Sequence, residues 1–299
     1  MDSQLFYPRR SFAFPPEQYT DFDKAKVVVL PIPYDSTVDW HSGTRDGANA
    51  IIDASHFLEQ YDYELGREIF QVGIHTLPQL IPSMKGPEET VERVYQATRD
   101  LLKKDKFVVM LGGEHSLTVG VVRAYKERFD KLSVLQLDAH ADLRDEYEGS
   151  RFNHACAMRR VIEMCPIVQV GIRSMSADDQ EFIQQKKMRP FYAKEAALTE
   201  AEEQKIVSAL TDDVYITIDL DAFDPSIMSA VGTPEPGGMG WHEVLRLLKR
   251  VAKGKRIVGF DVVELAPREG PASCTYLAAR LAYKLIGLSI PGLGSPPPL

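Results

Sequence analysis

Cysteine is scarce in this chain, and basic residues are outnumbered by acidic ones. Cys156, Cys165 and Cys274 are the three cysteines among 299 residues, and no Cys-x-x-Cys spacing occurs. This pattern argues against a disulfide framework and against a cysteine-ligated zinc cluster. Acidic residues number 43 and basic residues 35, which gives a formal charge of −8. Proteins that bind nucleic acid or anionic membranes show a basic stripe, so we expect neither partner.

Long hydrophobic runs are also absent from the sequence. The apolar C-terminal segment is interrupted by Arg280 and Lys284, and no stretch reaches the ~18 apolar residues of a membrane span. Arg9 and Arg10 are not followed by an apolar segment, so no signal peptide is visible. Together with the few cysteines, these features predict a cytoplasmic protein.

The chain shows no internal repeat and no dividing linker. Although ~150 residues per domain would suggest two domains, we expect a single domain over residues 1–299. The one segment of low complexity is the Pro-rich end at 291–299, which we expect to be a flexible tail.

Short apolar runs rich in Val and Ile recur along the chain. Because they are nearly continuous, they are typical of strands buried on both faces of a parallel sheet. Helix-like segments fall between many of them, and this alternation predicts an α/β sheet with helices on both faces. The expected strands are 26–30, 69–74, 107–111, 132–137, 167–172, 214–218 and 256–262, and the expected helices are 87–102, 116–129, 241–251 and 272–286.

Three polar segments each follow an expected strand, at the end where parallel α/β sheets bind ligands. The first is Gly112-Gly113-Glu114-His115-Ser116. Its glycines permit a sharp exit from the strand, and we expect Ser116 to be the N-cap of the next helix. His115 is then a candidate metal ligand, although a single histidine is more often a hydrogen-bonded structural residue.

The other two segments are rich in carboxylates. In Asp138-Ala139-His140-Ala141-Asp142 the three ionisable side chains would project to one side of an extended chain. Such crowding is costly unless a cation neutralises it. Thr217 to Pro225 places Asp219 and Asp221 on one face before an Asp224-Pro225 turn. A solvated acidic turn and a helix-capping loop are the respective alternatives.

Together the three segments offer four carboxylates and two imidazoles. Oxygen-rich ligation with some imidazole suits Mn²⁺ better than a structural zinc site. Six ligands exceed what one ion needs, so we expect two Mn²⁺ ions per subunit, ~3.5–4 Å apart, which activate a shared water. The expected ligands are His115, Asp138, His140, Asp142, Asp219 and Asp221.

These three segments resemble the metal motifs of the ureohydrolase family, which includes arginases and agmatinases. Three further segments resemble family motifs in the same order, so the resemblance runs from about residue 30 to 270; they are Ser42–Ile51, Gly232–Gly238 and Gly259–Pro267. The resemblance implies a three-layer α/β/α fold with a largely parallel eight-stranded sheet, as in arginases and deacetylases. It also implies a homo-oligomer, either a trimer or a hexamer.

The resemblance assigns roles to individual residues as well. One ion would lie between His115 and Asp142, the other between His140 and Asp221, and both would be bridged by Asp138 and Asp219. His154 corresponds to a proton-shuttle histidine and Glu264 to the acid that binds the guanidinium. The alternatives for these two are an exposed histidine at a helix start and a surface carboxylate. For Asp261 we expect only a structural hydrogen bond.

The segment from Leu143 to His154 distinguishes members of the family. It lacks the threonine- and serine-rich pattern of arginases and resembles agmatinase loops. Its acids Asp145, Glu146 and Glu148 would attract a distal ammonium group. Arg144 and Arg151 offset part of this negative charge and leave an acidic tail open. We therefore expect a small cationic guanidino substrate, agmatine, which would be hydrolysed to urea and putrescine. Guanidinobutyrate and arginine are the alternative substrates.

Two functions of other classes stay open. A deacetylase-like hydrolase would use one Zn²⁺ and would not need both Asp142 and the second carboxylate of the Asp219–Asp221 pair. A non-catalytic metal-binding protein would need neither His154 nor Glu264. The presence of the whole set favours the ureohydrolase.

Overall fold

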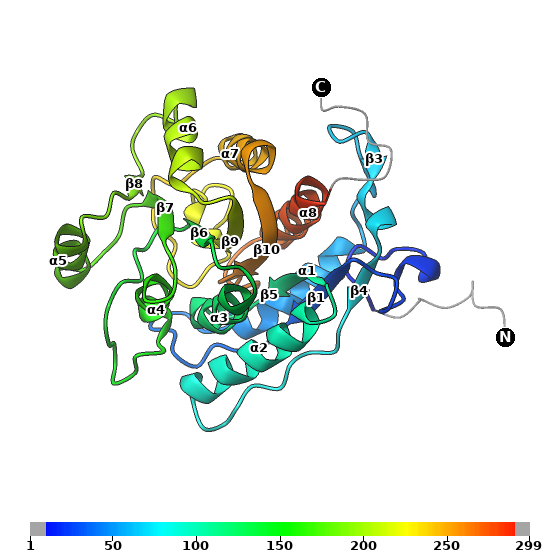
Figure 1. The fold of residues 1–299 in the computed structure, drawn as a ribbon, viewed down its shortest axis with the longest axis horizontal. Coiled ribbons are helices and arrows are strands. Elements are labelled where there is room, and N and C mark those ends of the chain that lie inside the picture. The colour runs from blue at the N-terminus through cyan, green and yellow to red at the C-terminus, as the bar shows by residue number, and fades with distance from the viewer. Residues whose placement is uncertain (1–9, 291–299) are drawn as a thin grey trace.

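An eight-stranded sheet forms the centre of the molecule in the computed structural model, which describes residues 10–290 (Figure 1). The expected Pro-rich tail at 291–299 lies outside the described residues. Every neighbouring pair of strands in this sheet runs parallel. Between residues 10 and 290, no helix has the length and apolar character needed to cross a membrane.

The strands of the sheet are arranged in the order β4-β1-β5-β10-β9-β6-β7-β8. Their bounds are β1 (Val27–Pro31), β4 (Ile74–Thr76), β5 (Phe107–Leu111), β6 (Leu132–Leu137), β7 (Ile167–Ile172), β8 (Phe191–Tyr192), β9 (Asp213–Asp219) and β10 (Arg256–Val263). A separate two-stranded ribbon pairs β2 (Tyr61–Asp62) with β3 (Arg67–Glu68).

Helices cover both faces of the sheet, so the fold has the three expected layers. One face packs against α1 (Gly47–Ser55), α6 (Glu200–Ala209), α7 (Trp241–Gly254) and α8 (Ala272–Ser289). The other packs against α2 (Pro87–Leu102), α3 (Thr118–Arg128), α4 (Ala157–Ile162) and α5 (Ala177–Lys186). In β1, Val27 and Val29 join the first core while Val28 and Leu30 join the second. A strand buried on both faces therefore reads as a continuous apolar run.

Several predicted elements have the predicted bounds, including β5, β6, β7 and α2. The strand predicted over 69–74 is wrong for its first part. Residues Ile69–Val72 form a 3-10 helix, and Gly73 follows with a φ of 79°. The chain becomes a strand only from Ile74. The shorter helices α1, α4, α5 and α6 are not among the predicted elements.

The expected N-cap role of Ser116 is wrong as well. A 3-10 helix, His115–Leu117, precedes α3, and its N-cap residue is Glu114. The Ser116 hydroxyl instead donates a hydrogen bond to the Glu114 carboxylate. This turn follows β5, one of the four central strands, and so places His115 over the middle of the sheet.

Candidate metal centre

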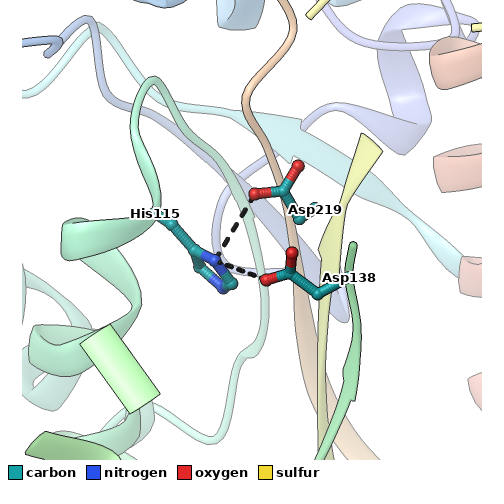
Figure 2. Close-up of side chains that lie close together, drawn as sticks. All are labelled: His115, Asp138 and Asp219. Carbon is teal, nitrogen blue, oxygen red and sulfur yellow. Dashed lines mark ion pairs between the residues drawn. The ribbon is translucent and has the colours of Figure 1, made fainter. Parts of the chain in front are cut away.

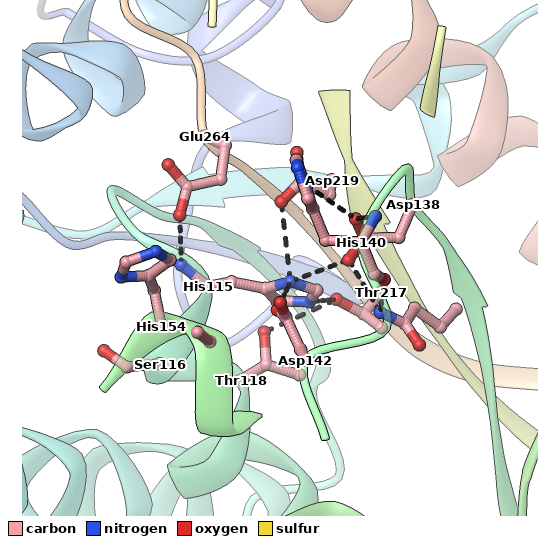
Figure 3. Close-up of polar contacts among 12 residues, drawn as sticks. His115, Ser116, Thr118, Asp138, His140, Asp142, His154, Thr217, Asp219 and Glu264 are labelled. Carbon is pink, nitrogen blue, oxygen red and sulfur yellow. Dashed lines mark hydrogen bonds and ion pairs between the residues drawn. The ribbon is translucent and has the colours of Figure 1, made fainter. Parts of the chain in front are cut away.

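The six expected metal ligands converge beyond the carboxyl ends of β5, β6 and β9. Figure 3 shows all of them except Asp221 with labels. Five of them are buried, and His140 is the more exposed member. Because β9 lies between β6 and β10, and β10 between β9 and β5, segments distant in sequence meet at one edge of the sheet. The site therefore depends on the strand order as much as on the motifs.

Three carboxylates surround the imidazole of His115. Its Nδ1 lies 3.1 Å from Asp138 Oδ2, 2.9 Å from Asp142 Oδ2 and 3.5 Å from Asp219 Oδ2. Figure 2 shows His115 with Asp138 and Asp219. Ligand atoms of these three residues lie within 4.8 Å of one another, which is close enough for one ion to bind all three.

A second group of ligands surrounds His140. Its Nδ1 lies 2.8 Å from Asp221 Oδ2 and 3.8 Å from Asp138 Oδ1. These three residues also offer ligand atoms within 4.8 Å of one another. Asp138 is common to both groups, with one oxygen near each histidine, so its position fits a carboxylate that bridges two ions.

The hydrogen bonds of His115 show that Nε2 carries a proton. Thr217 Oγ1 donates its proton to Asp261 Oδ1 at 2.6 Å, so it accepts from His115 Nε2 at 2.9 Å. Nδ1 faces the three carboxylates and has no other hydrogen-bond partner. Burial lowers the pKa of His115, but Asp138 and Asp142 raise it by more, so that it lies well above its ordinary value. Buried carboxylates that meet at a ring nitrogen require positive charge, and a metal ion bound to the neutral ring would supply it. Asp261 also accepts hydroxyl protons from Thr118 and Tyr215, which is a structural role.

Burial and the crowding of carboxylates also shift the pKa values of several ligands. Burial and the charges of Asp221 and Asp142 raise the pKa of Asp138 to about 7. Burial and the charge of Asp221 raise the pKa of Asp219 well above its usual range. Burial lowers the pKa of His140, but Asp221 raises it by more, to about 10. Without a cation these groups would have to hold protons, and divalent ions would replace that positive charge.

Two residues of the site adopt left-handed backbone conformations. Asp142 has a φ of 52° and Glu264 a φ of 65°. Such conformations cost ~1–3 kcal/mol in residues other than glycine and cluster at functional sites. Here they turn one carboxylate toward His115 and the other into the same cavity.

Glu264 directly follows β10 and is buried. Its Oε1 accepts a hydrogen bond from the backbone N–H of His115 at 2.7 Å, and its own N–H donates to Gly113 O at 2.8 Å. Burial and the nearby Glu114 raise the pKa of Glu264 well above its usual range. A desolvated carboxylate beside the metal ligands is suited to bind a cationic group.

His154 begins the 3-10 helix His154–Cys156, so it stands at a helix start as its alternative interpretation has it, but its side chain is not exposed. The Asn153 side chain caps this turn by accepting from Ala155 N at 2.9 Å. The backbone N–H of His154 donates to Thr37 Oγ1 at 2.9 Å, and Nδ1 donates to Thr37 O at 2.7 Å. Nε2 lies 3.8 Å from Asp39 Oδ1.

The residues that hold His154 are not predicted from the sequence. Glu114 is fully buried, and its two oxygens accept from Thr37 N and Thr37 Oγ1, each at 2.7 Å. Burial raises the pKa of Glu114. Glu114 adjoins His115 within a motif already identified, but Thr37 and Asp39 lie in a loop without a recognisable pattern.

Two adjoining cavities lead into the site. The inner one, of about 20 Å³, is lined by metal ligands and Glu264, and the outer one is larger, about 200 Å³. Asp39 and His154 line both of them. The outer cavity is therefore the space in which the part of a substrate beyond its reacting group would lie.

The acids of the 143–154 segment do not line either cavity. Asp145 is exposed and pairs with Arg160 and Arg151, the latter at 3.1 Å. Glu146 and Glu148 are exposed. The interpretation that these three acids attract the distal ammonium is not supported by their positions, because the carboxylates at the outer cavity come from other segments.

Comparisons with known proteins agree with this geometry. A model of the arginase family matches residues 25–287. An N(1)-aminopropylagmatine ureohydrolase of Synechocystis sp. is 41% identical over 283 residues, which are 91% of each chain. An agmatinase of Pyrococcus horikoshii is 35% identical and covers 95% of this chain and 99% of its own. The crystal structure of an agmatine ureohydrolase of Thermoplasma volcanium matches with a TM-score of 0.85 at 30% identity, over 96% of each chain.

Proposed function

The chain belongs to the arginase family, and from this premise we propose that it is a manganese-dependent ureohydrolase of cationic guanidino amines. The substrates proposed are agmatine and its N1-aminopropyl derivative. The observation that carries the proposal is the position of His115 Nδ1, which faces three buried carboxylates in the cavity that also contains Glu264.

Six residues would hold two divalent ions in this centre. The two groups that share Asp138 support a binuclear arrangement, with Asp142 beside His115 and Asp219 as the second bridge. The oxygen-rich donor set supports Mn²⁺ over Zn²⁺, since thiolates are absent from it. Two such ions supply the activation of a water molecule near neutral pH.

Glu264 would bind and orient the guanidinium. Its carboxylate is held by the backbone N–H of His115, so it faces the metal ligands at a fixed angle. A guanidinium can donate two parallel hydrogen bonds to one carboxylate. Because it is weakly hydrated, its transfer from water into such a pair costs little free energy. This contact would position the guanidinium carbon for attack by the activated water.

His154 would deliver the proton that the leaving amine needs. Nδ1 already donates to Thr37, so Nε2 is the atom that exchanges a proton with substrate. Nε2 lies on the side of Asp39, where the two cavities meet. Water and the guanidino compound would thus give urea and the free amine: putrescine from agmatine, spermidine from its aminopropyl derivative.

The charge of the outer cavity supports a substrate with a cationic tail. Asp39 and Asp179 line it, while Arg144 is its one arginine and stacks on Tyr147 at 4.4 Å. A tail that ends in a carboxylate, as in guanidinobutyrate or arginine, would face Asp39 and Asp179 there, beside the metal ligand Asp142. These two compounds are therefore the less favoured substrates.

Urea release by purified protein loaded with Mn²⁺ tests the proposal. Agmatine, N1-aminopropylagmatine, guanidinobutyrate and arginine would be compared at equal concentration, with chelator-treated protein as the control. We expect turnover of the two cationic compounds, loss of turnover on chelation, and recovery with Mn²⁺. Urea release from none of the four would overturn the proposal, and full activity with one zinc ion per chain would overturn its binuclear manganese part.

A further inference from the structure

Asp179 is a buried carboxylate with one unused oxygen. It is the third residue of α5, where its Oδ2 accepts from Ser176 N at 2.8 Å and its N–H donates to Ser176 Oγ at 3.1 Å. Only 4% of the residue is exposed, and Oδ1 has no hydrogen-bond partner. A buried carboxylate oxygen without a partner is costly and needs an explanation.

Helix capping does not explain the free oxygen of Asp179. The first turn of α6 contains the same capping box, formed by Thr199 and Glu202. There both carboxylate oxygens are used: Oε2 accepts from the N–H and hydroxyl of Thr199, and Oε1 accepts from Lys194. Asp179 is also one of the residues that line the outer cavity.

Asp39 is another carboxylate of the outer cavity, which the metal ligand Asp142 also lines. One of its oxygens accepts from the Tyr147 hydroxyl at 3.2 Å, and the other lies 3.8 Å from His154 Nε2. Asp39 lines both cavities, whereas Asp179 lines only the outer one. Along the path from Glu264 outward, Asp39 therefore precedes Asp179.

The outer cavity has room for more than a short tail. It measures about 200 Å³, and roughly 10–15 Å³ is enough for one water molecule. Ser174, Ser176 and Met175 complete the wall near α5. Such a space accommodates several methylene groups between two charged nitrogen atoms.

We propose that Asp39 and Asp179 form a cation subsite that binds the two ammonium groups of an extended polyamine tail. Asp39 would pair with the first ammonium group beyond the guanidinium, and Asp179 Oδ1 with a second one farther out. The inference rests on the proposed ureohydrolase function and specifies its substrate as a guanidine whose tail carries two ammonium groups. Agmatine, which has one such group, would use Asp39 alone.

The test compares kcat/KM for N1-aminopropylagmatine with kcat/KM for agmatine in Mn²⁺-loaded Asp179→Asn. Asparagine keeps an oxygen for the helix cap and removes the charge. We expect the ratio to fall about tenfold, as for one charged hydrogen bond. Asp39→Asn should lower kcat/KM for both substrates, because each has an ammonium group at that position. An unchanged ratio in Asp179→Asn would overturn the subsite.

Two matched variants control for the helix. Asp178→Asn removes an exposed charge from the adjacent position of α5, and Glu202→Gln alters the equivalent cap of α6. Neither residue lines the outer cavity. Both variants should keep the wild-type ratio; an equal fall in either of them would show a structural effect and overturn the assignment.

A binding measurement separates this inference from the proposed function. Spermidine has ammonium groups but no guanidinium, and calorimetry can measure its Kd without turnover. We expect the Kd to rise about tenfold in Asp179→Asn and in Asp39→Asn. If Asp179→Asn does not fold, Asp39→Asn decides the test, and an unchanged Kd would overturn the subsite. Wild-type protein that binds spermidine in this way but releases no urea would overturn only the proposed reaction.

Discussion

His154 Nδ1 lies 2.7 Å from the carbonyl oxygen of Thr37. A carbonyl oxygen only accepts hydrogen bonds, so Nδ1 holds a proton and Nε2 is the nitrogen that can exchange one. The hydroxyl of the same threonine accepts a hydrogen bond from the backbone N–H of His154 and donates one to the carboxylate of the buried Glu114. The orientation of the proposed shuttle is thus set by a loop residue that is distant in sequence.

Replacement of Thr37 by Val should slow the reaction. Valine has the shape of threonine and keeps the backbone contacts with Glu114 and His154, but it lacks the hydroxyl that donates to Glu114 Oε1 and accepts from the backbone N–H of His154. One oxygen of the buried carboxylate therefore loses its partner, at a cost of ~1–3 kcal/mol. We expect kcat for agmatine to fall about tenfold with a smaller change in KM. Thr37→Ser keeps the hydroxyl and should retain most of the rate. Equal kcat values for the Val variant and the wild type would contradict the role of this contact.

Replacement of Asp138 by Asn should remove the link between the two metal groups. Asp138 belongs to both groups of metal ligands, and its negative charge would offset part of the positive charge of the ions. We expect the metal content to fall by about one ion per chain and the rate of urea release to fall about 100-fold or more. Elemental analysis and a urea assay measure the two effects, with Asp178→Asn as the control. Full metal content in the variant would show that Asp138 is not a ligand.

The metal-free protein should become less stable as the pH rises. The folded-state pKa values of Asp138 (about 7) and His140 (about 10) lie above their ordinary values. The folded chain then binds more protons than the unfolded chain, and the free energy of unfolding decreases with pH. The contribution of Asp138 is lost as the pH rises through 7, and that of His140 is lost between its ordinary pKa and 10.

Thermal melts at pH 6 and pH 8.5 would measure this effect. The Tm of metal-free protein should be lower at pH 8.5, and Mn²⁺ should raise the Tm more at pH 8.5 than at pH 6, because metal ligands must lose their protons. A larger Mn²⁺ effect at pH 6 would contradict the direction of the pKa shifts.

Neutralising Glu146 and Glu148 together should leave substrate preference unchanged. Both side chains are exposed and neither lines a cavity, so their charges are screened by solvent and salt. The ratio of kcat/KM for agmatine and guanidinobutyrate should change less than about twofold. A large fall in agmatine use alone would restore the interpretation that this segment selects the substrate.

Gly113→Ala should damage both the fold and the site. A Cβ at Gly113 would lie 1.8 Å from Tyr34 O, and the Gly113 carbonyl receives the N–H of Glu264. We expect the free energy of unfolding to fall by about 3 kcal/mol, with a lower kcat. Gly240→Ala is the control, because it has no neighbour within 4 Å and a φ of −84°. A urea denaturation curve that matches the wild type would contradict the clash.

Much of the fold was predictable from local pattern. The strands β5, β6 and β7 are nearly continuous apolar runs that are buried on both faces. Such a run lacks the polar face of a surface helix, so its pattern favours a strand. The segment 69–74 was predicted wrongly because apolar runs of this length also occur in 3-10 turns, and Gly73 at positive φ ends the turn. Short helices such as α4 have too few residues for a clear periodicity.

The chemistry expected of the centre follows from the sequence, because the ligand types and their spacing are local properties of three segments. Which groups meet depends on the fold. The order of β5, β10, β9 and β6 brings His115 against three carboxylates from two other segments. The residues around the outer cavity, Asp39 and Asp179, come from a loop and a helix start whose meeting depends on long-range packing. No local pattern encodes such a contact, because its free energy arises only once the whole sheet has formed.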